Sequence, residues 1–197
     1  MQRIESGRLG GRYLLRLPKG VPGLRPTAAR VRGAVFDRIG SEVRGARVLD
    51  LFGGSGAMSV EAISRGAQKA TVVELSGKVA RHLRTQAEAL GITEQLQVVK
   101  ADALEFLQRG GSAYDLVIID PPFAIPEVVD GIAERIVQGW LAEGAIVVCE
   151  RELVRGKSRE VAWPESLELE ATKHYGQAVV EFLRFAPKTE SLHADDL

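Results

Sequence analysis

Residues 48–56 read Val48-Leu49-Asp50-Leu51-Phe52-Gly53-Gly54-Ser55-Gly56, an apolar run that ends in a glycine-rich turn. Glycines let a backbone turn tightly and approach a ligand at the carboxyl edge of an open α/β sheet. No Gly-Lys-Ser/Thr follows, which argues against a P-loop, and Ser59 stands where a dinucleotide fingerprint needs its third glycine. The stretch therefore predicts a strand, a turn and a helix around a nucleoside-like ligand, although a purely structural turn has the same pattern.

Apolar strand runs alternate with helical stretches from residue 46 onward. We expect strands at 46–51, 70–73, 96–99, 116–119 and 145–149, and helices at 57–65, 78–90, 103–109 and 126–140. Short apolar strands separated by helices indicate crossover connections in a parallel sheet covered on both faces. Two extended runs, 167–172 and 178–185, predict a terminal hairpin. The predicted fold is α/β, a doubly wound and mostly parallel seven-stranded sheet.

The chain divides into a basic extension at residues 1–44, a main domain at 45–187 and a polar, flexible tail at 188–197. Glycines between segments 2–6 and 12–17 predict a small β-hairpin in the extension. Thr27 can cap a helix whose apolar positions continue to Ile39.

Charge is distributed unevenly along the chain. The first 44 residues contain ten basic side chains and three acidic ones, in a chain whose formal net charge is +0. Nine of the ten are arginines, whose planar guanidinium suits bidentate phosphate contacts. We therefore expect the extension to bind a polyanion, with a solvated basic arm that binds no ligand as the alternative.

Composition narrows the class of protein. Hydrophobic residues make up 45% of the 197 residues and charged residues 26%, as in soluble globular proteins. Cys149 is the single cysteine, so an intramolecular disulfide and a cysteine metal cluster are excluded. No basic and apolar leader or apolar run of roughly 20 residues is present, so we expect a cytoplasmic protein without a membrane span. His82, His174 and His193 suggest neither a metal site nor a catalytic triad.

Acidic residues follow the second and third predicted strands. Glu74 can accept hydrogen bonds from both hydroxyls of a ribose, whether the ligand is NAD or S-adenosylmethionine. An exposed strand-end acid is the alternative for Glu74. Asp102 can accept a hydrogen bond from an adenine amino group or cap the following helix, and the two roles are compatible.

The fourth predicted strand ends in Asp120-Pro121-Pro122-Phe123. Two prolines stiffen the backbone, so they fix the direction of a carbonyl and of the neighbouring carboxylate. An exocyclic amine that donates its N–H groups to Asp120 and to the Pro121 carbonyl can aim its lone pair at an electrophilic methyl group. Phe123 would stack on an unpaired or extruded base. The motif predicts amine methylation, whereas a lone Pro-Pro also ends strands without any chemical role.

These motifs together resemble those of class I S-adenosylmethionine-dependent methyltransferases with a Rossmann-like sheet. The resemblance extends through Arg3-Ile4, Gly11-Arg12, the segment from Arg25 to Phe36 and Tyr175-Gly176. With these, the chain from about residue 3 to 185 resembles the RsmD family of bacterial 16S ribosomal RNA guanine-N2 methyltransferases. The resemblance implies an enzyme that uses S-adenosylmethionine and acts on 16S rRNA or the small ribosomal subunit, and we expect a monomer without a metal.

The resemblance also assigns residues to three roles. The implied catalytic residues are Asp120, Pro121, Pro122 and Phe123. The implied cofactor-binding residues are Asp50, Phe52, Gly53, Gly54, Gly56, Glu74, Leu75, Asp102, Ala103 and Asp120. The implied RNA-binding residues are Arg25, Thr27, Arg30 and Arg32. Gly33 departs from the family, which usually has glutamate there, so the contact made by that glutamate is in doubt.

Three alternatives stay open. One is an adenine-N6 or other amino methyltransferase that acts on DNA or on another RNA, although 197 residues leave little room for a separate target-recognition domain. A nicotinamide-dependent oxidoreductase is disfavoured by the missing third glycine. A non-enzymatic RNA-binding assembly protein is disfavoured by the presence of both Glu74 and Asp120.

Overall fold

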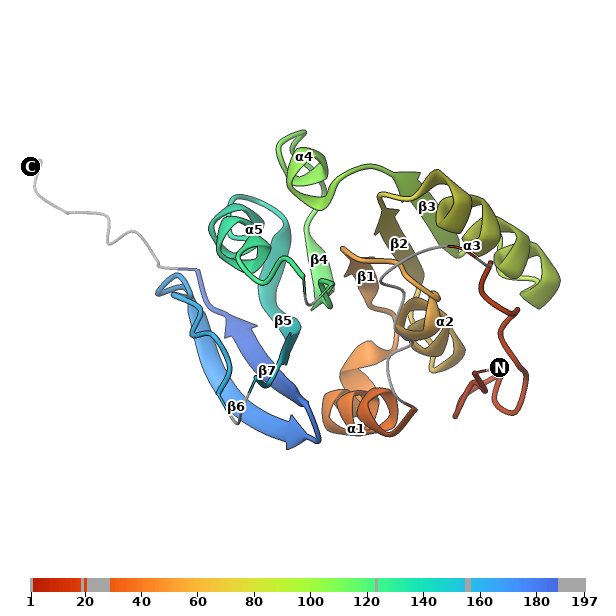
Figure 1. Cartoon of the computed structure of the whole chain (residues 1–197), viewed down its shortest axis with the longest axis horizontal. Helices are drawn as coiled ribbons and strands as arrows, with labels where there is room; N and C mark the ends of the chain where they lie inside the picture. Colours follow the sequence, from red (N-terminus) through yellow and green to blue (C-terminus); the bar gives the residue numbers. More distant parts are fainter. Residues whose placement is uncertain (1, 19, 21–28, 123, 155–156, 188–197) are drawn as a thin grey trace, which may run out of the picture.

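A seven-stranded sheet forms the centre of the molecule (Figure 1), in a computed structural model that describes residues 2–18, 20, 29–122, 124–154 and 157–187. The strand order is β3-β2-β1-β4-β5-β7-β6. Strands β1 to β5 are parallel, and β7 runs antiparallel between β5 and β6. The strands are β1 (Arg47–Asp50), β2 (Lys69–Glu74), β3 (Leu96–Lys100), β4 (Tyr114–Ile119), β5 (Leu141–Glu152), β6 (Leu167–Tyr175) and β7 (Ala178–Phe185). The predicted doubly wound, mostly parallel sheet is confirmed.

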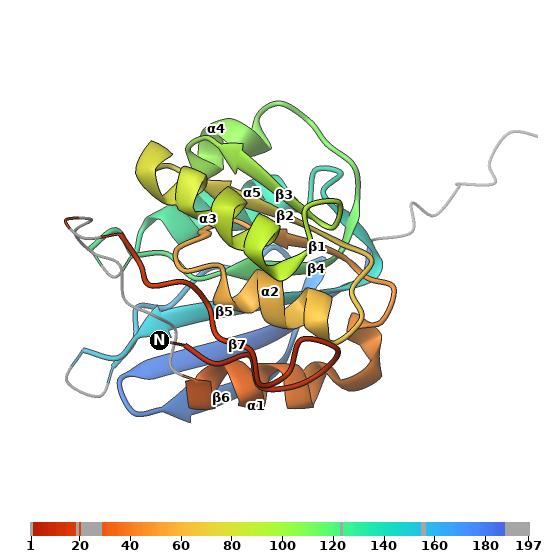
Figure 2. The same cartoon turned by 90° about the vertical axis from the view of Figure 1, so that its right-hand side faces the viewer.

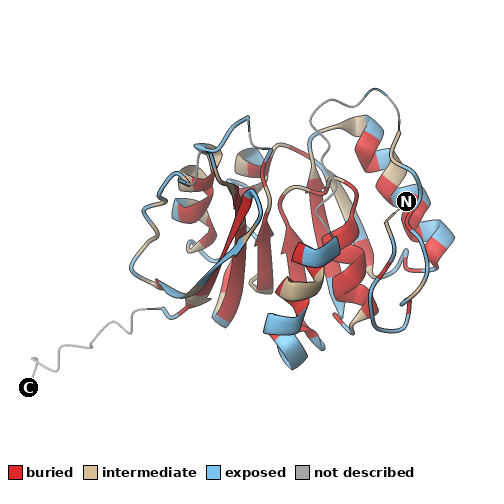
Figure 3. Cartoon of the chain, turned by 60° about the horizontal axis from the view of Figure 1, so that its bottom comes forward, coloured by how far each residue is buried: buried red, intermediate tan, exposed pale blue. Residues whose placement is uncertain are grey.

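Helices cover both faces of the sheet because alternate strand residues point to opposite sides. They are α1 (Ala29–Ile39), α2 (Ala57–Ser64), α3 (Gly77–Leu90), α4 (Ala103–Leu107) and α5 (Val128–Ile136), with a 3-10 turn at Gly40–Val43 after α1. Helices α1, α2 and α3 share one buried cluster with Val48 of β1, and α4 and α5 share the other with Leu49. Figure 3 shows the strands as a buried layer with exposed residues on the surrounding helices and loops.

Helix α3 begins and ends at residues that commonly cap helices. Ser76 caps α3 by accepting a hydrogen bond from the Val79 N–H, and Gly91 ends the helix at φ 70°. The predicted fifth helix was too long, because α5 ends at Ile136 rather than near residue 140. Trp140 instead packs in the core and donates its indole N–H to the Leu107 carbonyl at 3.0 Å. Among the described residues, no helix combines the length and apolar character needed to cross a membrane.

The N-terminal segment forms a short hairpin that packs on the main core. An antiparallel bridge joins Arg3 and Tyr13, and backbone hydrogen bonds run from the Ile4 N–H to the Arg12 carbonyl and from the Leu14 N–H to the Gln2 carbonyl, both at 2.8 Å. The predicted hairpin is confirmed, although its pairing is shorter than the expected segments 2–6 and 12–17. The Glu61 carboxylate on α2 accepts hydrogen bonds from the backbone N–H groups of Glu5 (2.9 Å) and Ser6 (3.1 Å). These contacts hold the hairpin beside α2 (Figure 2). The described part of the following helix begins at Ala29, and both Thr27 and the predicted tail lie outside the described residues.

Candidate active site

The glycine-rich turn follows β1 at the carboxyl edge of the sheet. Gly54 and Gly56 have φ values of 49° and 73°, a region that favours glycine. Asp50 is 2% exposed, and its two carboxylate oxygens accept hydrogen bonds from the Phe52 N–H (3.3 Å) and the Ser59 hydroxyl (2.7 Å). Asp50 therefore holds the turn and the first part of α2 together from the inside.

Glu74 connects this turn to the end of β2. One carboxylate oxygen accepts a hydrogen bond from the Gly54 N–H at 3.0 Å, and the other accepts one from the Ser76 N–H at 2.7 Å. Glu74 is thus half-buried and fixed, unlike a simple exposed strand-end acid. The next side chain, Leu75, is 67% exposed and offers an apolar surface at the same edge.

Asp102 follows β3 and caps α4. Its Oδ1 accepts hydrogen bonds from the N–H groups of Leu104 (2.8 Å) and Glu105 (3.2 Å), which confirms the predicted capping role. Oδ2 takes part in neither bond. Ala103 is buried in the first turn of α4, and Phe52 packs against the same hydrophobic cluster.

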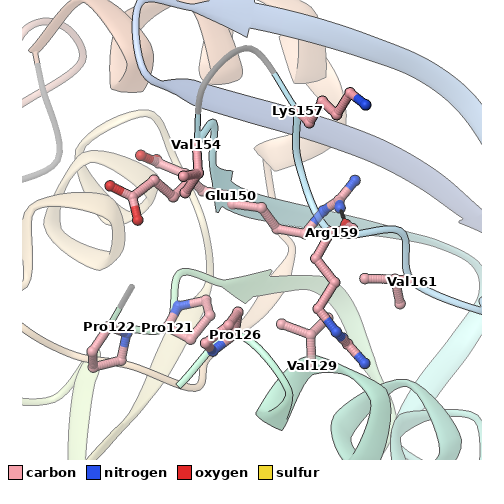
Figure 4. Close-up of a pocket in the computed structure, with 11 residues that line it drawn as sticks. Pro121, Pro122, Pro126, Val129, Glu150, Val154, Lys157, Arg159 and Val161 are labelled. Carbon is pink, nitrogen blue, oxygen red and sulfur yellow. Dashed lines mark hydrogen bonds between the residues drawn. The ribbon is translucent and has the colours of Figure 1, made fainter. Parts of the chain in front are cut away.

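Asp120 and Pro121 leave β4 at this same edge of the sheet. Pro121 is buried and Pro122 is exposed, and the Pro122 carbonyl accepts a hydrogen bond from the Ile125 N–H at 3.1 Å. Phe123 lies outside the described residues. The two prolines line a pocket of about 230 Å³. The pocket's other apolar lining residues are Pro126, Val129, Val154 and Val161, and its charged lining residues are Glu150, Arg151, Glu152, Lys157 and Arg159 (Figure 4).

Burial and neighbouring carboxylates raise the pKa values of Asp50 and Glu150 at this edge. Burial raises the pKa of Asp50 to about 7, against the lowering effect of its hydrogen bonds, and the charges of Asp120 and Glu74 add to the increase. Burial, followed by the charge of Asp120, raises the pKa of Glu150 to about 8. The site therefore favours a cationic ligand, which would stabilise the ionised carboxylates.

Glu150 is a site residue that the sequence analysis missed. It follows Cys149, the last residue of a predicted strand. Asp50, Glu74, Asp102 and Asp120 occupy the same position at or just after the ends of the other four parallel strands. An acidic residue at the end of every parallel strand was the signal that would have identified Glu150.

Arg32 does not face RNA, so its predicted role was wrong. Its side chain is 1% exposed, donates to the Arg3 carbonyl at 2.7 Å and pairs with Glu5 at 3.1 Å and Glu61 at 3.5 Å. A buried guanidinium that pairs with the buried Glu61 and with the more exposed Glu5 is not available to contact phosphate. Arg30 is exposed on α1.

Other basic residues near the N-terminus have structural partners as well. Arg12 donates hydrogen bonds to the carbonyls of Leu90 (3.1 Å) and Ala89 (2.8 Å) at the end of α3, and Arg8 donates to the side chain of Gln95. These acceptors are neutral, so Arg8 and Arg12 keep their charge while also holding the segment to α3 and the following loop. Arg25 and Thr27 lie outside the described residues.

The sequence matches a family model and is similar to proteins of the same name from two bacteria. A family model described as "Conserved hypothetical protein 95" matches residues 2–184. The chain is similar to ribosomal RNA small subunit methyltransferase D of Escherichia coli K12, with 36% identity over 157 residues, 78% of this chain and 76% of that protein. The Haemophilus influenzae protein of the same name is 33% identical over 177 residues, 88% of this chain and 89% of that protein.

Solved structures extend the similarity to three dimensions. A putative methyltransferase, yhhF, from Escherichia coli superposes with a TM-score of 0.84 at 29% identity, covering 95% of this chain and 99% of that one. An RNA methyltransferase from Salinibacter ruber, solved in complex with S-adenosyl-L-homocysteine, has a TM-score of 0.65 at 15% identity, covering 85% and 97%. At that identity, the second similarity concerns the fold.

Proposed function

The chain belongs to the ribosomal RNA small subunit methyltransferase D family, and we propose that it transfers a methyl group from S-adenosylmethionine to the exocyclic N2 amine of a guanine in 16S rRNA. The observation that carries this proposal is the placement of Asp120 and Pro121 beside the carboxylate-bounded glycine turn. The carboxylates around the glycine turn suit a cationic nucleoside ligand, and Asp120 and Pro121 suit an amine that donates hydrogen bonds.

The described residues fit S-adenosylmethionine. Glu74 would hold the ribose hydroxyls, Leu75 would cover one face of the adenine, and Asp102 would accept from the adenine amino group. The raised pKa of buried Asp50 supports the fit, because a positively charged ligand favours its ionised form. When bound, S-adenosylmethionine supplies an electrophilic methyl group on a positively charged sulfur.

Asp120 and Pro121 would prepare the acceptor amine. The guanine N2 lone pair is delocalised into the ring, so the free amine is a poor nucleophile. When its two N–H groups donate to the Asp120 carboxylate and the Pro121 carbonyl, the nitrogen becomes pyramidal and its lone pair points away from these acceptors. Asp120 also stabilises the positive charge that develops on nitrogen. Phe123 is the proposed stacking residue for the base.

The proposed substrate is the small ribosomal subunit or its 16S rRNA, which places the activity in the cytoplasm. Arg30, Arg25 and Thr27 are the proposed RNA contacts, and residues 1–44 the proposed RNA-binding extension of a main domain at 45–187. Phosphate contacts position an RNA without specifying its sequence, and structured RNA is recognised largely by shape. The target nucleotide would therefore be selected jointly by RNA shape and by the base pocket.

Transfer of labelled methyl groups to small subunits purified from cells that lack this protein tests the proposal. Nucleoside analysis should find the label in N2-methylguanosine of 16S rRNA. Label in adenosine or in DNA would retain the methyltransferase activity but contradict the guanine assignment. Naked 16S rRNA and assembled subunits should be compared in the same assay, because only the form with the recognised shape should be methylated efficiently.

A further inference from the structure

Glu150 of β5 lies beside Asp120, which directly follows the neighbouring strand β4. Strands β4 and β5 are parallel, with Ile118 opposite Val148 and Ile119 opposite Cys149. This register makes Asp120 and Glu150 the next pair, on neighbouring strands that lie about 4.8 Å apart. Both residues line a small cavity that is also bounded by Val180. A group held by Asp120 is therefore within reach of Glu150.

Glu150 also lines the larger pocket beside the two prolines. Figure 4 shows Glu150 above Pro121 and Pro122, with Arg159 and Val161 further to the right. The walls at Pro121, Pro122 and Val161 are apolar and suit the flat face of a base. A base in this pocket would have its polar edge towards the two acidic residues.

The polar edge of guanine matches this pair of acids. Its N1–H lies directly beside the N2 amine, so both groups are donors that point in nearly the same direction. In adenine, the ring nitrogen beside the exocyclic amine carries a lone pair instead of a hydrogen. Two neighbouring acceptors therefore suit guanine. With adenine, the second acceptor would face the lone pair of the ring nitrogen, and the two would repel each other.

We infer that Glu150 is a specificity-determining residue that accepts a hydrogen bond from the N1–H of the target guanine while Asp120 and Pro121 hold its N2 amine. The inference rests on the proposed function and adds a role for Glu150. In the free protein, the pKa of Glu150 is raised to about 8 by burial and by the charge of Asp120. An N–H donor at its carboxylate stabilises the ionised form, so guanine binding compensates for an unfavourable charge. Arg151, Lys157 and Arg159 are the cations among the residues that line the same pocket, and Glu152 is a further acid there.

A base analogue isolates this contact. 2-Aminopurine keeps the amine of guanine but has a lone pair on N1. Two small-subunit RNAs are prepared that differ only in guanosine or 2-aminopurine riboside at the methylated position, and each is assembled into subunits. The kcat/KM ratio for the two substrates is then measured for the wild-type protein and for Glu150→Leu and Glu150→Gln. The loss of the guanine O6 is common to all three proteins and cancels when their ratios are compared.

The guanine preference of Glu150→Leu should be roughly 10- to 100-fold smaller than that of the wild-type protein, as for loss of a hydrogen bond to a charged group. Glu150→Gln keeps an uncharged acceptor, so its preference should fall by roughly 3- to 10-fold. Glu143→Leu is the matched control, because Glu143 is exposed near the opposite end of β5. Its preference should equal that of the wild-type protein.

Thermal melting and S-adenosylmethionine affinity identify any variant that has lost its fold, and the glutamine variant keeps the size of the side chain if leucine is not tolerated. Folded Glu150 variants that keep the wild-type preference would overturn the role of Glu150 while leaving the proposed function intact. A wild-type protein that methylates no guanosine would instead refute the proposed function itself.

Discussion

The guanidinium Nε of Arg32 lies 3.5 Å from a carboxylate oxygen of Glu61, and both side chains are only 1% exposed. Glu61 also accepts from the Arg65 Nε at 2.8 Å and from two backbone N–H groups of the N-terminal segment. One buried carboxylate thus joins α1, α2 and the N-terminal segment. The pair organises the protein's architecture, although Arg32 belongs to a sequence motif that suggested RNA binding.

Glu61→Gln should lower the free energy of unfolding by about 3–5 kcal/mol, because it leaves the buried Arg32 charge with weaker compensation. Denaturant titration followed by circular dichroism measures the change. Glu88→Gln removes an exposed carboxylate from α3 and should change the stability by less than about 0.5 kcal/mol. Equal stabilities for the two variants would show that the buried pair is unimportant to the fold.

Much of the sheet could be predicted from the sequence, because each buried parallel strand is a short apolar run. The position of Arg32 could not be predicted in this way. Its partner Glu61 lies on a different helix, and the pairing depends on how the N-terminal segment packs against α2. The local sequence indicates which residues form a helix. The contact between Arg32 and Glu61 depends instead on how segments distant in sequence pack together.

In the candidate site, too, some residues could be identified from a local motif, whereas the position of others depends on the tertiary structure. Asp120 and its prolines form a continuous motif, so their chemistry could be inferred directly. Glu150 has no motif of its own, and the pattern of an acid at each strand end indicates only that it lies at this edge. Its position beside Asp120 follows from the register of β4 and β5. The glycines between residues 6 and 12 correctly indicated the turn of the N-terminal hairpin, but they could not show that this hairpin packs against α2.

Asp120→Ala should lower kcat by roughly 10²- to 10³-fold, because it removes a preorganised acceptor at the amine. Asp120→Asn keeps one acceptor oxygen and should retain more activity than the alanine variant. Single-turnover methyl transfer at saturating S-adenosylmethionine and RNA separates this effect from binding. A wild-type rate in the alanine variant would exclude Asp120 from the chemistry.

The stability of the ligand-free protein should fall as pH rises between about 4.5 and 8. The pKa of Glu150 is raised to about 8, so the unfolded chain releases this proton at a lower pH than the folded protein does. Across that window the folded state binds more protons, and one such group lowers the stability by up to about 1.4 kcal/mol per pH unit. Asp50, whose pKa is raised to about 7, contributes in the same direction from about pH 4 to 7.

Glu150→Gln should make this decline less steep and leave the variant more stable than the wild-type protein at pH 8. Denaturant midpoints at pH 5 and pH 8 measure the difference, with Glu143→Gln as the control because Glu143 is exposed. Parallel pH profiles for the wild-type protein and Glu150→Gln would mean that Glu150 is not the group that titrates.

Arg30→Ala should weaken RNA binding without lowering stability, because Arg30 is exposed on α1 while Arg32, two residues later, is buried. A lost phosphate contact reduces affinity for all RNA sequences alike, and it lowers the slope of log affinity against log salt by about one. Filter binding to 16S rRNA across a salt series measures both quantities. Arg32→Ala should instead destabilise the fold, and its RNA affinity should fall only as the protein unfolds. An unchanged salt slope in folded Arg30→Ala would remove Arg30 from the RNA interface and shift the search to other basic residues of the extension.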